Sequence, residues 1–316
     1  MQKRVFCVLP VYNDWESLEI LLENLEKSQE AYSNEYLFSA VIVNDGSTEE
    51  MTILKTNIEH RILNLKTNVG HQRAIAIGLQ YVFNETEKIE CVVVMDSDGE
   101  DKPEHIIHLL EKAKTEDFNK IIFAQRKKRQ ESSLFKTGYF FYKKLFNFLT
   151  GQKISFGNFC VIPKDLLTSV VYLDNIWNHF SGGIIQSKIP FDKVLLDRGK
   201  RYKGSSKMNF YSLTLHGLSS IAVYFDYLSL KILKYSFYGI IASIISICYI
   251  LLKKFFTDTA IPGWASSLIL IISGIILQLF SVTLIVLLLQ LSYRKNINKP
   301  TSKVYLNFIR DVQKFN

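Results

Sequence analysis

Two acidic residues, Asp96 and Asp98, follow a run of apolar residues at 91–95. On an extended strand, residues i and i+2 face the same side, so both carboxylates would point one way where the strand ends. Like charges on one face repel each other unless a cation lies between them. Carboxylate oxygens suit Mg²⁺ or Mn²⁺, and Mg²⁺ commonly takes its other ligands from substrate phosphates. The spacing favours a metal–diphosphate site, although a solvated turn has the same pattern when it stands alone.

Apolar segments alternate with segments of helical periodicity over residues 1–125. Strands are predicted at 5–9, 38–43, 61–65, 91–95 and 120–124, and helices at 15–30, 48–58, 70–83 and 103–114. This alternation, with nearly continuous apolar strands, is typical of a mostly parallel sheet covered by helices on both faces. The predicted fold class is therefore α/β, Rossmann-like, with ligands bound beyond the carboxyl ends of the strands.

Polar motifs follow three other predicted strands. They are Pro-Val-Tyr-Asn-Asp at 10–14, Asn-Asp-Gly-Ser-Thr at 44–48 and Asn-Val-Gly at 68–70. Taken singly, the second motif is a good turn and Asp14 is a candidate helix N-cap. Because the carboxyl ends of parallel strands meet at one edge of a sheet, we expect all of these motifs to lie beside Asp96 and Asp98.

Two long uncharged segments occupy the C-terminal third of the chain, at 235–252 and 259–293. Each is long enough for a helix that crosses a bilayer, and spans are predicted near 235–252 and 264–288. Two such segments in succession make a buried helix of a soluble protein the weaker alternative. Residues 207–234, which carry an apolar face, are predicted to lie at the membrane interface.

These segments predict four parts: a soluble α/β domain at 1–206, an interface segment at 207–234, two transmembrane helices within 235–293, and a tail at 294–316. Basic residues flank the two spans at Lys231, Lys234, Arg294, Lys295 and Lys299. Because cytoplasmic flanks of spans are enriched in Lys and Arg, both ends are placed in the cytoplasm. The expected location is the inner (cytoplasmic) membrane, with two passes and the α/β domain in the cytoplasm.

The chain of 316 residues has a formal net charge of +8, and the basic excess lies mainly at 120–144 and 198–207. Such an excess indicates nucleic acid, anionic lipid or a phosphorylated substrate. Beside two membrane spans, lipid and phosphate are favoured, and no nucleic acid is expected. Arginine binds phosphate through two parallel hydrogen bonds, which makes Arg126, Arg129 and Arg201 candidate phosphate ligands. For 126–129 the alternative is a solvated loop or a patch on anionic lipid.

The sequence resembles glycosyltransferase family 2, whose members carry the GT-A nucleotide-sugar-binding fold. The resemblance rests on the motifs at 10–14, 43–48, 68–70 and 95–98. Within that family it looks most like the polyprenyl-phosphate glycosyltransferases, relatives of dolichol-phosphate mannose synthase. The narrower likeness rests on the two C-terminal spans and on Arg126-x-x-Arg129-x-x-Ser132, Gly157-Asn-Phe159 and Arg198-x-x-Arg201-x-x-Gly204-x-Ser206-Lys207.

The resemblance implies roles for the matching residues. The implied nucleotide-binding residues are Pro10, Tyr12, Asp14, Asp45 and Asp96. The implied ligands of Mg²⁺ or Mn²⁺ are Asp96, Asp98 and Glu100, the last standing where dolichol-type enzymes often have Gln. The implied acceptor-phosphate residues are Arg126, Arg129, Ser132, Arg201 and Lys207, and the implied catalytic residues are Asp96, Asp98 and Arg126. Asn158 stands where the bacterial enzymes usually have Asp, which leaves that role open.

The implied reaction moves a sugar from a UDP- or GDP-sugar to a polyprenyl phosphate such as undecaprenyl phosphate, with inversion, and supplies lipid-linked sugar for the cell envelope. A phosphomonoester has a second pKa of about 6, so its dianion needs no protein base. The alternatives are another acceptor, such as diacylglycerol or a glycan, and a non-catalytic nucleotide-binding module. Retention of Asp45, Asp96 and Asp98 argues against the module. The sugar, and assembly into a homo-oligomer, stay open.

Overall fold

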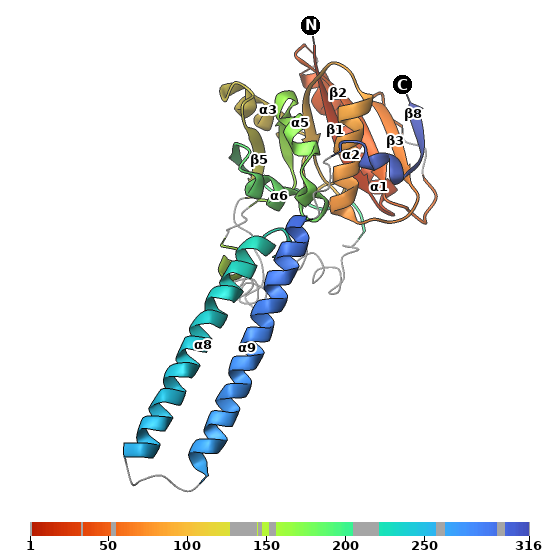
Figure 1. Ribbon diagram of the computed structural model, residues 1–316. Helices are drawn as coiled ribbons and strands as arrows, with labels where there is room; N and C mark the ends of the chain where they lie inside the picture. The colour runs from red at the N-terminus through yellow and green to blue at the C-terminus, as the bar shows by residue number, and fades with distance from the viewer. Residues whose placement is uncertain are drawn as a thin grey trace. The chain divides into compact units, whose positions relative to one another are not determined.

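The chain is described by a computed structural model over residues 2–32, 34–51, 55–126, 144, 147–151, 156–204, 221–256, 263–295 and 301–315. Figure 1 shows the arrangement of its elements. The described residues fall into two compact units. The first comprises those within 1–141, 153–223 and 300–316, and the second those within 142–152 and 224–299.

An eight-stranded mixed sheet forms the centre of the first unit, in the order β7-β5-β6-β4-β1-β2-β3-β8. Its strands are β1 (Lys3–Val11), β2 (Tyr36–Asn44), β3 (Glu59–Leu65), β4 (Ile89–Val94), β5 (Ile121–Arg126), β6 (Cys160–Pro163), β7 (Phe191–Leu196) and β8 (Ile309–Phe315). The four central strands β4, β1, β2 and β3 are parallel. β6 and β8 pair antiparallel with their neighbours. The predicted α/β fold class, with a sheet that is parallel at its centre, is confirmed.

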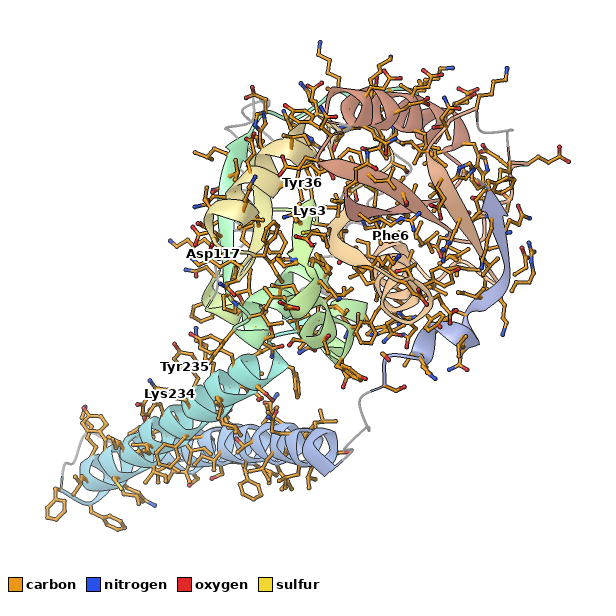
Figure 2. The ribbon with its side chains drawn as sticks, turned by 90° about the horizontal axis from the view of Figure 1, so that it is seen from above. Lys3, Phe6, Tyr36, Asp117, Lys234 and Tyr235 are labelled. Carbon is orange, nitrogen blue, oxygen red and sulfur yellow. The ribbon has the colours of Figure 1, made fainter. Side chains whose placement is uncertain are left out.

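Helices cover both faces of this sheet. α1 (Trp15–Ala31) and α3 (His105–Thr115) pack on one face, against the inward side chains of Val5, Cys7 and Val93. α2 (His71–Glu85), α5 (Lys164–Val171) and α6 (Phe180–Ser187) cover the other face, against Phe6 and Val8. Successive residues of β1 thus serve opposite cores, as the two-residue period of a strand requires. Figure 2 shows Phe6 within the sheet, and the paired residues Lys3 and Tyr36 where β1 and β2 begin.

The loop after β2 differs from the prediction, because the described residues within 48–58 contain no helix. The Asn13 side-chain oxygen accepts the backbone N–H groups of Thr48, at 2.8 Å, and Glu49, at 3.1 Å. Asn44 Oδ1 accepts that of Ser47 at 3.0 Å. Side chains that bind nearby backbone N–H groups compete with helical hydrogen bonds. The loop is therefore tied to the end of β1 instead of coiling.

The C-terminal residues belong to the first unit, where β8 extends the sheet by pairing with β3. A 3₁₀ turn, η2 (Val304–Asn307), precedes β8 and buries Tyr305 against α2. Gln80 of α2 holds this turn, since its Oε1 accepts the Tyr305 backbone N–H at 3.1 Å. The tail predicted at 294–316 therefore includes a strand of the main sheet. A second 3₁₀ turn, η1 (Asp174–Trp177), precedes α6.

The second unit contains two antiparallel helices, α8 (Phe225–Phe256) and α9 (Trp264–Lys295), each of 32 residues. Both are long and apolar enough, by length and composition, to cross a membrane. Gly239 lets them approach, since a Cβ there would lie 2.8 Å from a Leu279 methyl carbon. Lys234 and Tyr235, labelled in Figure 2, lie within α8, so part of the interface segment predicted at 207–234 is continuous with the first predicted span. Residues 207–220 lie outside the described residues.

Candidate active site

Four loops meet at the carboxyl ends of β1 to β4. Backbone hydrogen bonds join Asp45 N–H to Val11 C=O at 2.9 Å and Met95 N–H to Val8 C=O at 3.3 Å. The Ser97 hydroxyl donates to the Pro10 carbonyl at 3.0 Å. Motifs that lie up to 87 residues apart in the sequence therefore share one edge of the sheet.

Asp45 fixes the loop that opens α2. Its two carboxylate oxygens accept the backbone N–H groups of Val69, at 2.7 Å, and Gly70, at 3.0 Å. The residue is only 3% exposed. Burial raises the pKa of Asp45 to about 6, although the two backbone hydrogen bonds and the nearby His71 favour its charged form. The carboxylate assigned to the nucleobase is thus already a buried structural acceptor.

The turn after β4 is built from its own acids. Asp101 Oδ2 accepts the Asp96 backbone N–H at 3.0 Å, and Asp98 Oδ1 accepts the Glu100 backbone N–H at 2.9 Å. Gly99 has φ = +89°, which a residue with a side chain rarely adopts. This turn holds Asp96 and Asp98 at the end of the strand. Asp101, which is 6% exposed, was not predicted as a site residue; its place among the acids of 96–101 was the available signal.

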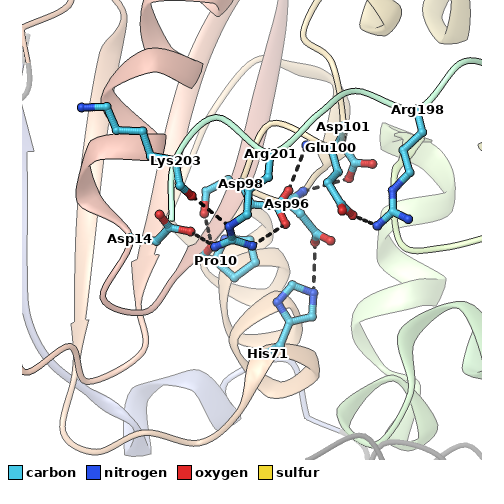
Figure 3. Close-up of polar contacts among 11 residues, drawn as sticks. Pro10, Asp14, His71, Asp96, Asp98, Glu100, Asp101, Arg198, Arg201 and Lys203 are labelled. Carbon is cyan, nitrogen blue, oxygen red and sulfur yellow. Dashed lines mark hydrogen bonds and ion pairs between the residues drawn. The ribbon is translucent and has the colours of Figure 1, made fainter. Parts of the chain in front are cut away.

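Each of the predicted metal-binding acids contacts a basic side chain (Figure 3). Asp96 Oδ1 lies 3.1 Å from His71 Nε2, and Glu100 forms an ion pair with Arg198. Arg201 contacts two acids: its Nη1 lies 3.0 Å from Asp98 Oδ2, and its Nη2 pairs with Asp14. The structure thus compensates four carboxylates with one histidine and two arginines, a pairing that the sequence analysis did not predict.

The electrostatics of these groups reflect crowded acids. Burial raises the pKa of Asp98, the charge of Asp96 raises it further, and Arg201 opposes both. Burial alone would lower the pKa of His71, but the charge and hydrogen bond of Asp96 outweigh it, so the pKa is raised. Both shifts have the sign expected where carboxylates crowd together in a partly buried site.

The donor set fits a divalent ion only in part. Within the described ranges, no group of three or more His, Cys, Asp or Glu side chains is arranged to hold a metal, so the three-ligand set including Glu100 is not assembled. Mg²⁺ is commonly held by one or two carboxylates, with substrate phosphates and water as the other ligands. Asp96 and Asp98 suit that mode, because each is hard, anionic and at the same sheet edge.

The other predicted residues are placed less fully. Tyr12 lies just beyond β1 and is 40% exposed, and Arg126 is the last residue of β5. Arg129, Ser132 and Lys207, as well as the Arg126 side chain, lie outside the described residues. Asn158 Nδ2 lies 3.1 Å from His71 Nε2. Asn158, whose role the sequence left open, therefore lies beside the histidine that contacts Asp96.

Asp14 lies at the N-cap position of α1, but its side chain makes no capping hydrogen bond. It pairs with Arg201 instead. The N-cap alternative for Asp14 is therefore met in position, whereas the side chain binds Arg201 and caps no helical N–H group.

A hollow of about 710 Å³ lies between α1, the start of α3 and residues 199–202, and its lining includes Lys27, His105 and Tyr202.

Known proteins resemble this chain in sequence and fold. The family described as Glycosyl transferase family 2 matches residues 6–177. An uncharacterized glycosyltransferase, YkcC of Bacillus subtilis, is 30% identical over 294 residues, which cover 87% of this chain and 85% of that protein. The undecaprenyl-phosphate 4-deoxy-4-formamido-L-arabinose transferase of Proteus mirabilis is 35% identical over 140 residues, 42% of this chain and 40% of that protein.

A solved structure shares the fold. Mannosyl-3-phosphoglycerate synthase from Rubrobacter xylanophilus superposes with a TM-score of 0.51 at 16% identity, covering 70% of this chain and 72% of that one. The central parallel strands, the carboxylate pair after β4 and the match over residues 6–177 agree with one another. The chain has a GT-A-like fold and belongs to glycosyl transferase family 2.

Proposed function

We propose that this protein transfers a sugar from a nucleoside-diphosphate sugar to a polyprenyl phosphate at a membrane. The observation that carries the proposal is the carboxylate pair Asp96 and Asp98 at the end of β4, beside the buried Asp45 at the end of β2. A diphosphate with a divalent ion suits the pair, and a nucleobase suits the neighbouring strand ends.

The donor is assigned to the ends of β1 and β2. Pro10, Tyr12 and Asp14 would hold the nucleobase, with the exposed ring of Tyr12 offering an apolar surface. Asp45 would accept a hydrogen bond from a base N–H, because each of its oxygens keeps a second lone pair. Ser97, by holding the Pro10 carbonyl at 3.0 Å, keeps the base-binding loop next to the carboxylate pair.

Asp96 and Asp98 would hold Mg²⁺ or Mn²⁺, and Glu100 would add a contact on leaving Arg198. When bound, such an ion stabilises the negative charge of a departing diphosphate. Asp101, through its hydrogen bond to the Asp96 N–H, holds the turn that carries the pair. His71 contacts Asp96 and orients it, so it needs no role as a base.

The acceptor phosphate is assigned to basic residues. These are Arg126, Arg129, Ser132, Arg201 and Lys207. A phosphomonoester, with a second pKa of about 6, is largely dianionic at pH 7. One of its oxygens attacks the anomeric carbon as the bond from that carbon to the donor phosphate breaks, which inverts the carbon. The leaving group is the nucleoside diphosphate, and no proton has to be removed from the acceptor.

A membrane location supports a lipid acceptor. α8 and α9 are both long and apolar enough to cross a membrane, and the chain enters α8 from the first unit and returns to it after α9. Two crossings would place the sheet and β8 on one side. Lys231 and Lys234 precede the hairpin core, which favours the cytoplasmic side. The Proteus mirabilis relative, by its name an undecaprenyl-phosphate transferase, supports the acceptor class over less than half of the chain.

The test supplies membranes that contain the protein with labelled UDP- or GDP-sugars, Mg²⁺ or Mn²⁺, and undecaprenyl phosphate or diacylglycerol. We expect a labelled lipid that mild acid cleaves, formed only with the polyprenyl phosphate. Label that appears only with diacylglycerol or a glycan replaces the proposed acceptor. Nucleotide binding without turnover of any donor would identify a non-catalytic module.

A further inference from the structure

Residues 197–204, which we call the strap, cross over the turn that carries Asp98. The Gly199 N–H donates to the Glu100 carbonyl, and the Tyr202 N–H donates to the Asp98 carbonyl, both at 2.9 Å. The Tyr202 ring lies against Gly99, where a Cβ would be 2.5 Å from it. The strap is therefore held to the site by its backbone and by Tyr202, apart from any arginine.

The Arg201 side chain bridges two acids that come from different loops. Its guanidinium contacts Asp14, which precedes α1, and Asp98, which follows β4. All three side chains are at most 22% exposed. The guanidinium therefore stands where the site presents its crowded carboxylates, in the region proposed for the divalent ion and the diphosphate (Figure 3).

Resting on the proposed function, we infer that Arg201 is an internal counter-ion that a divalent cation has to displace. The guanidinium pairs with Asp98. A divalent ion bound to Asp98 would lie beside the positive charge of Arg201 in a partly buried site, and the two cations would repel each other. Asp98 therefore cannot bind the metal and Arg201 equally well at the same time. Loading of the donor with its metal then releases Arg201 from Asp98.

This exchange implies an order of binding. Arg201 is one of the residues assigned to the acceptor phosphate, and while it is paired with Asp14 and Asp98 it is withheld from that role. Its release by the donor and metal makes a cation available for the acceptor. The donor therefore binds first, and the empty enzyme holds the lipid phosphate weakly.

The strap also supplies a matched control. Lys203 carries the same charge two residues away, but it pairs with Glu16, at 3.1 Å, outside the carboxylate cluster. Both partners are more than half exposed. Lys203→Ala thus removes one positive charge from the strap without removing a contact to Asp98. This variant therefore distinguishes competition between Arg201 and the metal for Asp98 from a general change in the electrostatic potential near the site.

The test measures Mn²⁺ binding to the full chain in detergent by the loss of the free-ion electron paramagnetic resonance signal, with no nucleotide present. Arg201→Ala and Arg201→Gln should bind Mn²⁺ about tenfold more tightly than the wild type, as expected from removing one charge-assisted hydrogen-bonded competitor. Lys203→Ala should stay within about twofold of the wild type, as expected for an exposed pair. Matching thermal midpoints would show that the variants are folded.

Unchanged or weaker Mn²⁺ binding by both Arg201 variants would overturn the inference, and so would an equal gain in Lys203→Ala. Asp98→Asn separates the two proposals. If it binds Mn²⁺ as the wild type does, the metal is not at this cluster and the proposed function fails too. If it loses Mn²⁺ while the Arg201 variants are unchanged, only the exchange fails.

The order of binding is read with the protein in detergent and a labelled short-chain polyprenyl phosphate. The amount of labelled phosphate that the wild type binds should rise when Mn²⁺ and UDP are added. Arg201→Ala should show no such rise, whereas Lys203→Ala should. A rise of equal size in Arg201→Ala, or none in the wild type, would contradict the release of Arg201.

Discussion

Asp45 accepts the backbone N–H of Gly70 at 3.0 Å, so the carboxylate assigned to the nucleobase also holds the first residue before α2. Its other oxygen accepts the N–H of Val69. The donor loop and the start of α2 therefore form one hydrogen-bonded unit. His71, the first residue of α2, lies next in the chain and contacts Asp96, which links this unit to the carboxylate pair.

Asp45 makes stability depend on pH. Its pKa is raised from 3.8 to about 6, so the folded chain holds this proton more tightly than the unfolded chain does. The contribution of Asp45 to stability is therefore fully present below the unfolded pKa of 3.8 and is lost as the pH rises through about 6. A pKa difference of about 2 corresponds to about 3 kcal/mol. Between pH 4.5 and 7, the midpoint temperature of thermal unfolding should fall more in the wild type than in Asp45→Asn. Parallel pH profiles would contradict this assignment.

Gln80 should be necessary for docking of the C-terminal turn. It is 1% exposed; its Nε2 donates to the carbonyls of Val171 and Thr301, and its Oε1 accepts the Tyr305 N–H. Gln80→Leu leaves buried backbone groups unpaired and should cost about 2–4 kcal/mol of unfolding free energy. Arg73→Ala, on the exposed side of the same helix, is the control. Equal midpoints for both variants in a denaturant titration would refute the role of Gln80.

Gly78 should not tolerate a side chain. A Cβ there would lie 2.5 Å from one methyl carbon of Val8 and 3.0 Å from one of Val43, because α2 packs closely on β1 and β2. Gly78→Ala should cost about 1–3 kcal/mol through overpacking. The same change at Gly274, where a Cβ meets nothing within 4 Å, should leave thermal unfolding unchanged. If Gly78→Ala unfolds at the wild-type temperature, the close packing of α2 at this position is contradicted.

Charges in the middle of α9 should weaken membrane attachment. Leu270 and Leu277 are 75% and 67% exposed in the helix pair. A lysine near the centre of a span, as at Leu277, costs about 2.5–3.5 kcal/mol, and one nearer the end, as at Leu270, costs less. The double variant Leu270→Lys, Leu277→Lys should be released from membranes by alkaline carbonate, while Leu306→Lys, in the first unit, should not. Retention of the double variant would argue against α9 as a span.

Much of the fold follows from local pattern. The apolar runs and helical spacing predicted the strands and helices around Asp96, and the uncharged segments predicted α8 and α9. The helix predicted at 48–58 is wrong, because Thr48 in this loop is hydrogen-bonded by Asn13, 35 residues earlier. β6 has four residues, too few for a periodic signal. β8 pairs with β3, more than 240 residues away, and no local pattern reports that partner.

The site was predictable as residue types at strand ends, but not as pairs. Asp45, Asp96 and Asp98 follow strands, so their meeting at one edge was expected from sheet geometry. The sequence assigned Arg201 to the acceptor phosphate, whereas the structure pairs it with Asp14 and Asp98. That pairing depends on how the strap crosses the turn, which is a tertiary relation. The individual roles of these residues stay predictions.

The central claim is that the charge of Asp98 holds the metal and the donor diphosphate. The most direct measurement is the initial rate of labelled sugar transfer to undecaprenyl phosphate, compared between wild type and Asp98→Asn at equal protein in membranes with Mn²⁺. The substitution keeps the size of the side chain and removes its charge. We predict a loss of about a hundredfold or more, as for the removal of one key electrostatic contact. A rate within a few fold of the wild type would contradict the account.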